Sequence, residues 1–93
     1  MPLSQEEATK LAIKDLSNRL GVAESDIAVG STENVDFPNA CLGAAMQGEM
    51  CAQMIMSGWR LLLRYKSQTY EYRGARNQLR LFGYNGQNYK VYP

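Results

Sequence analysis

Histidine is absent from this chain of 93 residues, and cysteine occurs only twice. Histidine is the side chain that most readily exchanges protons near neutral pH, and it is the commonest metal ligand. Two cysteines without histidine cannot complete a four-ligand zinc site of the usual kind. We therefore expect a protein that is not an enzyme and that holds no metal or other cofactor.

Long apolar runs are also missing. No stretch approaches the roughly 20 apolar residues that a membrane-spanning helix needs, and Met1-Pro2-Leu3 leads directly into polar residues, not into a secretory signal segment. If the protein is exported, the sequence is that of a mature chain with an added start methionine. The length fits one small domain over residues 1–93.

Charge is unevenly distributed along the chain. Residues 1–50 carry three basic and eight acidic side chains, a net charge of −5, whereas residues 51–93 carry seven basic and one acidic, a net charge of +6. One interpretation is that the two halves neutralise each other across the fold. The other is a basic surface for an anionic partner.

The beginning of the chain predicts a helix from about Ser4 to Leu20. Ser4-Gln5-Glu6-Glu7 has the form of a capping box, in which Ser4 and Glu7 each accept the backbone N–H of the other. Gly21 follows the last apolar residue, where a left-handed cap is typical. An apolar stripe at helical spacing runs through Ala8, Ala12, Leu16 and Leu20.

The remaining sequence predicts short strands joined by tight turns, which requires antiparallel pairing. Ser57-Gly58 and Asn85-Gly86 are expected to be two of the hairpin turns, and Met54 and Met56 to share a core-facing side of a strand. The resulting fold class is α+β, with one N-terminal helix packed on an antiparallel sheet of four to five strands, as in PepSY or cystatin-type modules. The expected strands cover residues 27–37, 51–56, 59–66 and 69–73, then the regions around Leu79 and Leu81 and around Tyr89 and Val91.

Cys41 and Cys51 enclose nine residues with few bulky side chains. A disulfide would restrict the unfolded chain and contribute about 3 kcal/mol in the entropic view. The alternative is a pair of unbonded, buried thiols, which behave as small apolar side chains. The spacing alone leaves both alternatives open.

Four segments carry a resemblance to a family of uncharacterised bacterial domains that is common in cyanobacteria and often exported. Its pattern runs from an aromatic-Pro-Asp-x-Cys-Leu-Gly step through Gly-Glu-x-Cys-x-Gln and Gly-Trp-Arg to a Tyr-Arg strand. The resemblance spans Leu11 to Phe82, with Phe37 in place of the usual Trp and Asn39 in place of the usual Asp. The matching segments are residues 37–43, 48–53, 58–60 and 70–73.

The resemblance implies a Cys41–Cys51 disulfide and a secreted or periplasmic location, and it implies no activity. We interpret the enclosed loop as a rigid contact surface for a protein partner, since a rigid loop loses less entropy on binding. A peptidase inhibitor is one such binder, with Met46 or Leu42 entering the specificity pocket, and a purely structural crossover is the alternative. The expected loop contacts are Leu42, Ala45, Met46, Gln47 and Met50.

The alternative function uses a basic sheet face to bind nucleic acid or another polyanion. Cationic strands with nearby aromatic side chains can hold phosphates and stack bases. Inward-facing aromatics and export both argue against nucleic acid. We expect a monomer or a weak dimer paired through an exposed last strand. The residues of this face are Arg60, Arg64, Arg73 and Arg80.

Overall fold

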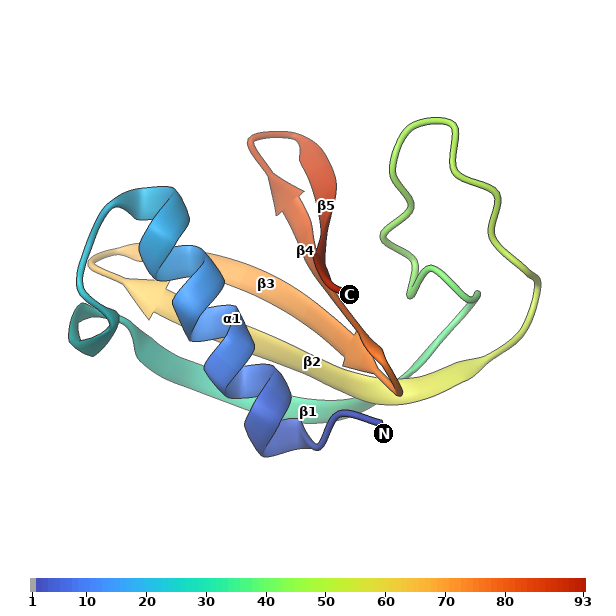
Figure 1. Ribbon diagram of the computed structural model, residues 1–93, viewed down its shortest axis with the longest axis horizontal. Helices are drawn as coiled ribbons and strands as arrows, with labels where there is room; N and C mark the ends of the chain where they lie inside the picture. The colour runs from blue at the N-terminus through green and yellow to red at the C-terminus, as the bar shows by residue number, and fades with distance from the viewer. Residues whose placement is uncertain (1) are drawn as a thin grey trace.

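The computed structural model describes residues 2–93. One helix covers a five-stranded sheet whose strands lie in the order β1-β2-β3-β4-β5, and every neighbouring pair is antiparallel (Figure 1). The predicted α+β class is confirmed. The elements are α1 (Gln5–Leu20), the short 3-10 helix η1 (Glu24–Asp26), β1 (Ala28–Phe37), β2 (Met56–Tyr65), β3 (Gln68–Ala75), β4 (Gln78–Tyr84) and β5 (Gln87–Tyr92).

Helix α1 begins and ends as predicted. The Ser4 hydroxyl accepts the Glu7 N–H at 3.1 Å and the Glu7 carboxylate accepts the Ser4 N–H at 3.0 Å. Gly21 adopts φ 67°, and its N–H donates to the Ser17 carbonyl. The apolar stripe packs on the sheet to form the main core, whose buried residues are Ala8, Ala12, Leu16, Ile27, Leu61, Leu63, Tyr72, Leu79 and Leu81.

A polar contact inside this core fixes the helix to the sheet. The Tyr72 hydroxyl donates to Asp15 Oδ2 at 2.8 Å, and Arg19 Nε donates to the same oxygen at 2.7 Å. Burial, together with the hydrogen bond to Asp15, raises the pKa of Tyr72, so its hydroxyl stays protonated and remains a donor. The guanidinium of Arg19 also lies 4.6 Å from the ring centre of Tyr89.

The opposite face of the sheet carries a second, smaller core. Phe37 and Met56 pair across β1 and β2, and both are buried there with Leu42 and Ala75. Side chains alternate between the faces of a strand, so this core lies on the side away from α1. The connection between β1 and β2, residues 38–55, supplies Leu42 and packs against one end of this second face.

Two expectations about the start of β2 are wrong. Residues 51–55 form no strand, and Met54 is 44% exposed instead of lying in the core. Ser57-Gly58 is no turn, because β2 runs straight through it. A Cβ atom on Gly58 would lie 2.0 Å from the Gly74 carbonyl oxygen, so glycine allows β3 to approach closely here.

The hairpin turns further along the chain occupy two residues each. Asn85 and Gly86 both adopt positive φ, as a type I′ turn requires, and the prediction of a hairpin there is confirmed. Strand β3 continues to Ala75, so residues 76 and 77 alone form the turn into β4. Near the start of β1 the register with β2 shifts between Val29 and Ser31, and Val29 is 47% exposed.

Candidate functional site

The connection 38–55 begins with a turn built by Asn39. Its Oδ1 accepts the N–H groups of Cys41 at 2.9 Å and Gly43 at 3.2 Å, which is the local bonding typical of asparagine in turns. Leu42 and Gly43 then adopt left-handed φ values of 58° and 65°. This reversal directs Leu42 into the second core, where it is fully buried. The prediction that Leu42 is presented to a partner is therefore wrong.

The two cysteines are joined. Cys41 and Cys51 form a disulfide with their Cα atoms 5.5 Å apart, a typical separation for such a bond. Cys41 is buried and Cys51 is half-buried. Beside the bond, the Ala40 N–H donates to the Ala52 carbonyl at 3.0 Å, so the two ends of the loop are also hydrogen-bonded. The disulfide implied by the resemblance is confirmed, and the alternative of free thiols is wrong.

A buried ion pair anchors the loop to β4 beside the disulfide. Arg80 is only 3% exposed, and its two terminal nitrogens donate to the two carboxylate oxygens of Glu49, each at 2.6 Å. Arg80 also donates to the Ala44 carbonyl at 3.2 Å, while Glu49 accepts the Met46 N–H at 2.9 Å. The hydrogen bonds from Arg80 lower the pKa of Glu49 to about 2, so the carboxylate is charged at neutral pH.

Three more side chains bind the loop backbone to successive strands. Arg73 of β3 donates to the Leu42 carbonyl at 3.0 Å, and Gln78 of β4 donates to the Ala40 carbonyl at 2.7 Å. Asn88 of β5 donates to the Ala45 carbonyl at 2.8 Å. The loop has no regular structure, yet it is held against three strands, and Figure 1 shows it rising beside the β4–β5 hairpin.

The face predicted to bind polyanions is largely neutralised within the chain. Arg60, Arg73, Arg80 and Lys90 lie in one cross-strand row. Its ion pairs join Arg60 to Glu33 and Glu71, Arg73 to Glu71, and Arg80 and Lys90 to Glu49.

Aromatic contacts and burial also make two of these arginines less accessible to a ligand. Arg73 stacks 3.7 Å from the ring centre of Phe82, and Arg80 is buried beneath the loop. Of the four predicted arginines, Arg64 alone is exposed and makes no ion pair among residues 2–93. The structure therefore fits the interpretation in which the acidic and basic halves neutralise each other.

The outer side of the loop is apolar and exposed. Met50 is 94% exposed, Ile55 71%, Met54 44% and Met46 38%. Ala45 and Gln47 are exposed as well, so four of the five predicted contacts are accessible to a partner. Met54 and Ile55 were missed because residues 51–56 were assigned to a strand.

A groove of about 330 Å³ lies between the loop and the β4–β5 turn. Its walls come from two segments that are far apart in sequence and that the Asn88–Ala45 hydrogen bond holds together. The volume is at the small end of the range for ligand sites, which suits a side chain better than a cofactor. Its lining consists of Ala45, Met46, Gln47, Gly86, Gln87, Asn88 and Tyr89.

One grouping has the composition of a metal site. Ligand atoms of Cys41, Glu49 and Cys51 lie within 4.8 Å of one another. The disulfide explains the closeness of the two sulfurs, and Arg80 already occupies both oxygens of Glu49. A metal would need thiolate sulfur, so this arrangement does not offer a cation a set of free ligands.

Comparison with known families places this chain in one of them. Among residues 2–93, no helix is long and apolar enough to cross a bilayer. Neither the curated proteins nor the solved structures include a match to this chain. The sequence model of one family, described as a domain of unknown function (DUF8738), matches residues 9–82. That match covers most of the helix and the sheet, and the chain belongs to the DUF8738 family.

Proposed function

We propose that this protein is a non-enzymatic, exported binding module that contacts a protein partner through the outer side of its disulfide-closed loop. We call this the loop surface, and it consists of Ala45, Met46, Gln47, Met50, Met54 and Ile55. The observation that supports the proposal is the near-complete exposure of Met50 on a backbone that is fastened on both sides.

The physical argument is that large apolar side chains gain free energy when they leave water. Exposed apolar residues gathered in one segment are typical of an interaction surface. Methionine side chains are flexible and polarisable, so they adapt well to a partner. The disulfide and the Arg80–Glu49 pair already hold the backbone, and little loop entropy remains to be lost on binding.

The disulfide also supports an oxidising compartment, because such bonds persist in secreted and periplasmic proteins and are rare in the cytosol. Secretion or periplasmic residence is therefore part of the proposal, as is membership of a bacterial, cyanobacterial-type group of exported domains. The test is to express the protein with a secretion leader and to assay free thiols in the exported material. Quantitative reaction with a thiol reagent under native, oxidising conditions would contradict this part.

Peptidase inhibition is the specific form of protein binding that the loop surface suggests. A loop that enters a protease specificity pocket needs one protruding side chain on a rigid backbone. Met46 and Met50 meet that description, whereas the buried Leu42 does not.

A panel of secreted and periplasmic peptidases tests inhibition, and photocrosslinking from position 46 in an exported-protein extract tests binding in general. Met50→Arg should abolish both. Val29→Arg is the matched control, because Val29 is an exposed apolar residue on β1 at the far side of the sheet. Equal loss with both variants, or no specific crosslink and no inhibition, would overturn the proposal.

A further inference from the structure

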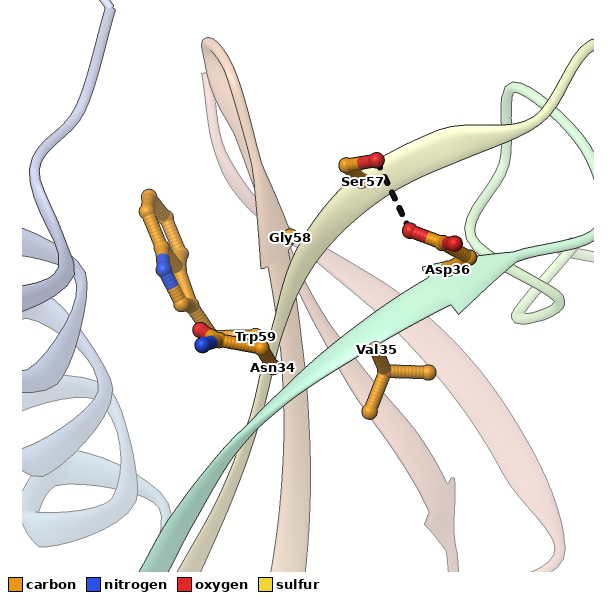
Figure 2. A pocket seen from close by; sticks show the side chains of 6 residues that line it. All are labelled: Asn34, Val35, Asp36, Ser57, Gly58 and Trp59. Atoms are coloured by element: carbon orange, nitrogen blue, oxygen red, sulfur yellow. Dashed lines mark hydrogen bonds between the residues drawn. The ribbon is translucent and has the colours of Figure 1, made fainter.

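A second cavity, of about 380 Å³, lies near the edge of the sheet that β1 forms. It is separate from the groove beside the loop. Figure 2 shows it between the last part of β1 and the first part of β2. Asn34 pairs with Trp59 and Asp36 with Ser57, so these four side chains share one face. Val35 points the opposite way, toward the second core, and Gly58 completes the lining.

The cavity offers the chemistry of a site for a cationic side chain. Asp36 is exposed, and Ser57 donates to its Oδ1 at 2.8 Å, which fixes the carboxylate and leaves Oδ2 for a ligand. Trp59 is half-buried and forms one wall. The lining contains this one carboxylate and no cationic side chain. A guanidinium can stack on an indole and donate two hydrogen bonds to a carboxylate.

Beside the cavity, β1 is an edge strand of the sheet. Within residues 2–93 it pairs with β2 on one edge, and no strand pairs with its other edge. Ser31 to Phe37 pair with β2 in continuous register, so the outer backbone groups of this stretch form a regular row. Natural sheets commonly block such edges with lysine, proline or a bulge. The bulge near Gly30 blocks the start of β1, but residues 31–37 contain no proline, lysine or arginine.

The charge of this edge favours a basic occupant. Glu33 and Asp36 are the charged residues of β1, and Asp36 makes no ion pair among residues 2–93, whereas Glu33 is paired with Arg60. Just before β1, η1 adds Glu24 and Asp26. An extended peptide that carried an acidic side chain beside Asp36 would meet repulsion there. A second copy of this chain paired through its own β1 would likewise bring two acidic strands together, which is unfavourable.

We propose that the free edge of β1 binds an extended, arginine-bearing peptide segment as a sixth strand, with the arginine in the cavity between Asp36 and Trp59. Backbone hydrogen bonds to residues 31–37 supply sequence-independent affinity, as in other cases of strand addition. The cavity makes the site selective for an arginine side chain. This site uses none of the residues of the loop surface and does not depend on its function.

Trp59 is the only tryptophan of the chain, so its fluorescence reports directly on the cavity. The probe is a nine-residue peptide of alternating threonine and valine with a central arginine, titrated into the disulfide-intact protein. Its control peptide replaces the arginine with citrulline, which has nearly the same shape without the charge. We expect saturable quenching and about tenfold weaker binding of the citrulline peptide, from the loss of a charged hydrogen bond.

The variant that tests the assignment is Asp36→Asn, whose side-chain oxygen can still accept the Ser57 hydroxyl. Asp26→Asn removes the same charge from η1, outside the cavity, and is the matched control. Asp36→Asn should weaken binding of the arginine peptide about tenfold and leave binding of the citrulline peptide unchanged. Asp26→Asn should change the affinity for neither peptide.

A peptide with N-methyl groups on all of its amides, which cannot donate to a strand from either edge, should not bind at all. Equal binding of the arginine and citrulline peptides, equal effects of the two variants, or binding of the N-methylated peptide would overturn the proposal. So would sedimentation that shows the free protein to be a dimer dissociated by Ser31→Pro, because the edge would then belong to a second copy.

Discussion

Arg80 and Glu49 face each other through two parallel hydrogen bonds, although they lie 31 positions apart in the sequence. Arg80 belongs to β4 and Glu49 to the connection 38–55, and β2 and β3 lie between them along the chain. The guanidinium is almost completely buried, and the Glu49 carboxylate is its only ion-pair partner among residues 2–93. The loop is therefore held to β4 beside its disulfide.

Glu49→Gln should strongly destabilise the protein. The variant leaves the charge of Arg80 buried without a counterion, and breaking such a pair costs about 3 kcal/mol. Glu33→Gln is the matched control, because its pair with Arg60 is exposed and should contribute less than about 1 kcal/mol. Urea unfolding of both variants measures the difference. Similar free energies of unfolding for the two would show that the buried pair does not hold the loop.

Acid should weaken this fastening between about pH 4.5 and pH 2. The pKa of Glu49 falls from its ordinary 4.5 to about 2 in the folded protein, chiefly because Arg80 donates hydrogen bonds to it. Stability from a lowered carboxyl pKa is complete above the unfolded pKa and disappears as the pH falls through the folded one. The unfolding free energy of the native chain should therefore decline more steeply in this window than that of Glu49→Gln. Parallel pH profiles would contradict the assignment.

Tyr72→Phe tests the polar contact between α1 and β3. The phenylalanine keeps the ring in the core but deprives Asp15 of the hydroxyl that donates to it. We expect a loss of about 1–2 kcal/mol in thermal or urea unfolding. Tyr70→Phe is the control, since the Tyr70 hydroxyl makes no side-chain hydrogen bond among residues 2–93, and it should change stability little. If Tyr72→Phe left the free energy of unfolding unchanged, water would have replaced the hydroxyl as the donor to Asp15.

Gly58→Ala should disrupt the junction of β2 and β3. The new methyl group would lie 2.0 Å from the Gly74 carbonyl oxygen and 2.7 Å from the Ala75 Cβ, so the strands would have to separate. Gly48→Ala places its methyl group in open space and costs only the strain of a positive φ, about 1 kcal/mol. Circular dichroism and unfolding should show a much greater loss for Gly58→Ala. Equal effects of the two substitutions would contradict the view that the close approach of β3 requires glycine at position 58.

The features that the sequence predicts well are local. The capping box, the apolar stripe of α1 and the Asn85-Gly86 turn each depend on a few neighbouring residues, and the structure has all three. The prediction of a turn at Ser57-Gly58 is wrong because glycine is common both in turns and where two strands approach closely. The second role depends on contacts with Ala75 of β3, which are distant in sequence.

The path of the loop could not be predicted in the same way. The parity of Arg80 places it on the face away from α1, but no local pattern indicates that Glu49 covers it. Leu42 is turned inward by a left-handed backbone conformation that leucine rarely adopts, so its sequence context predicted exposure. Met54 and Ile55 remain outside because the chain must pass around the rim of the sheet to reach β2.

The packing of the connection 38–55 has a consequence for how this protein can assemble. Helix α1 occupies one side of the sheet, but the connection covers only one end of the other side, where Phe37, Met56 and Ala75 are buried. At the opposite end of that side the charged Arg64 stays exposed. A molecule that stacked there would have to accommodate this charge, so larger complexes should grow preferentially from the perimeter, where the protruding methionines and the outermost strand lie.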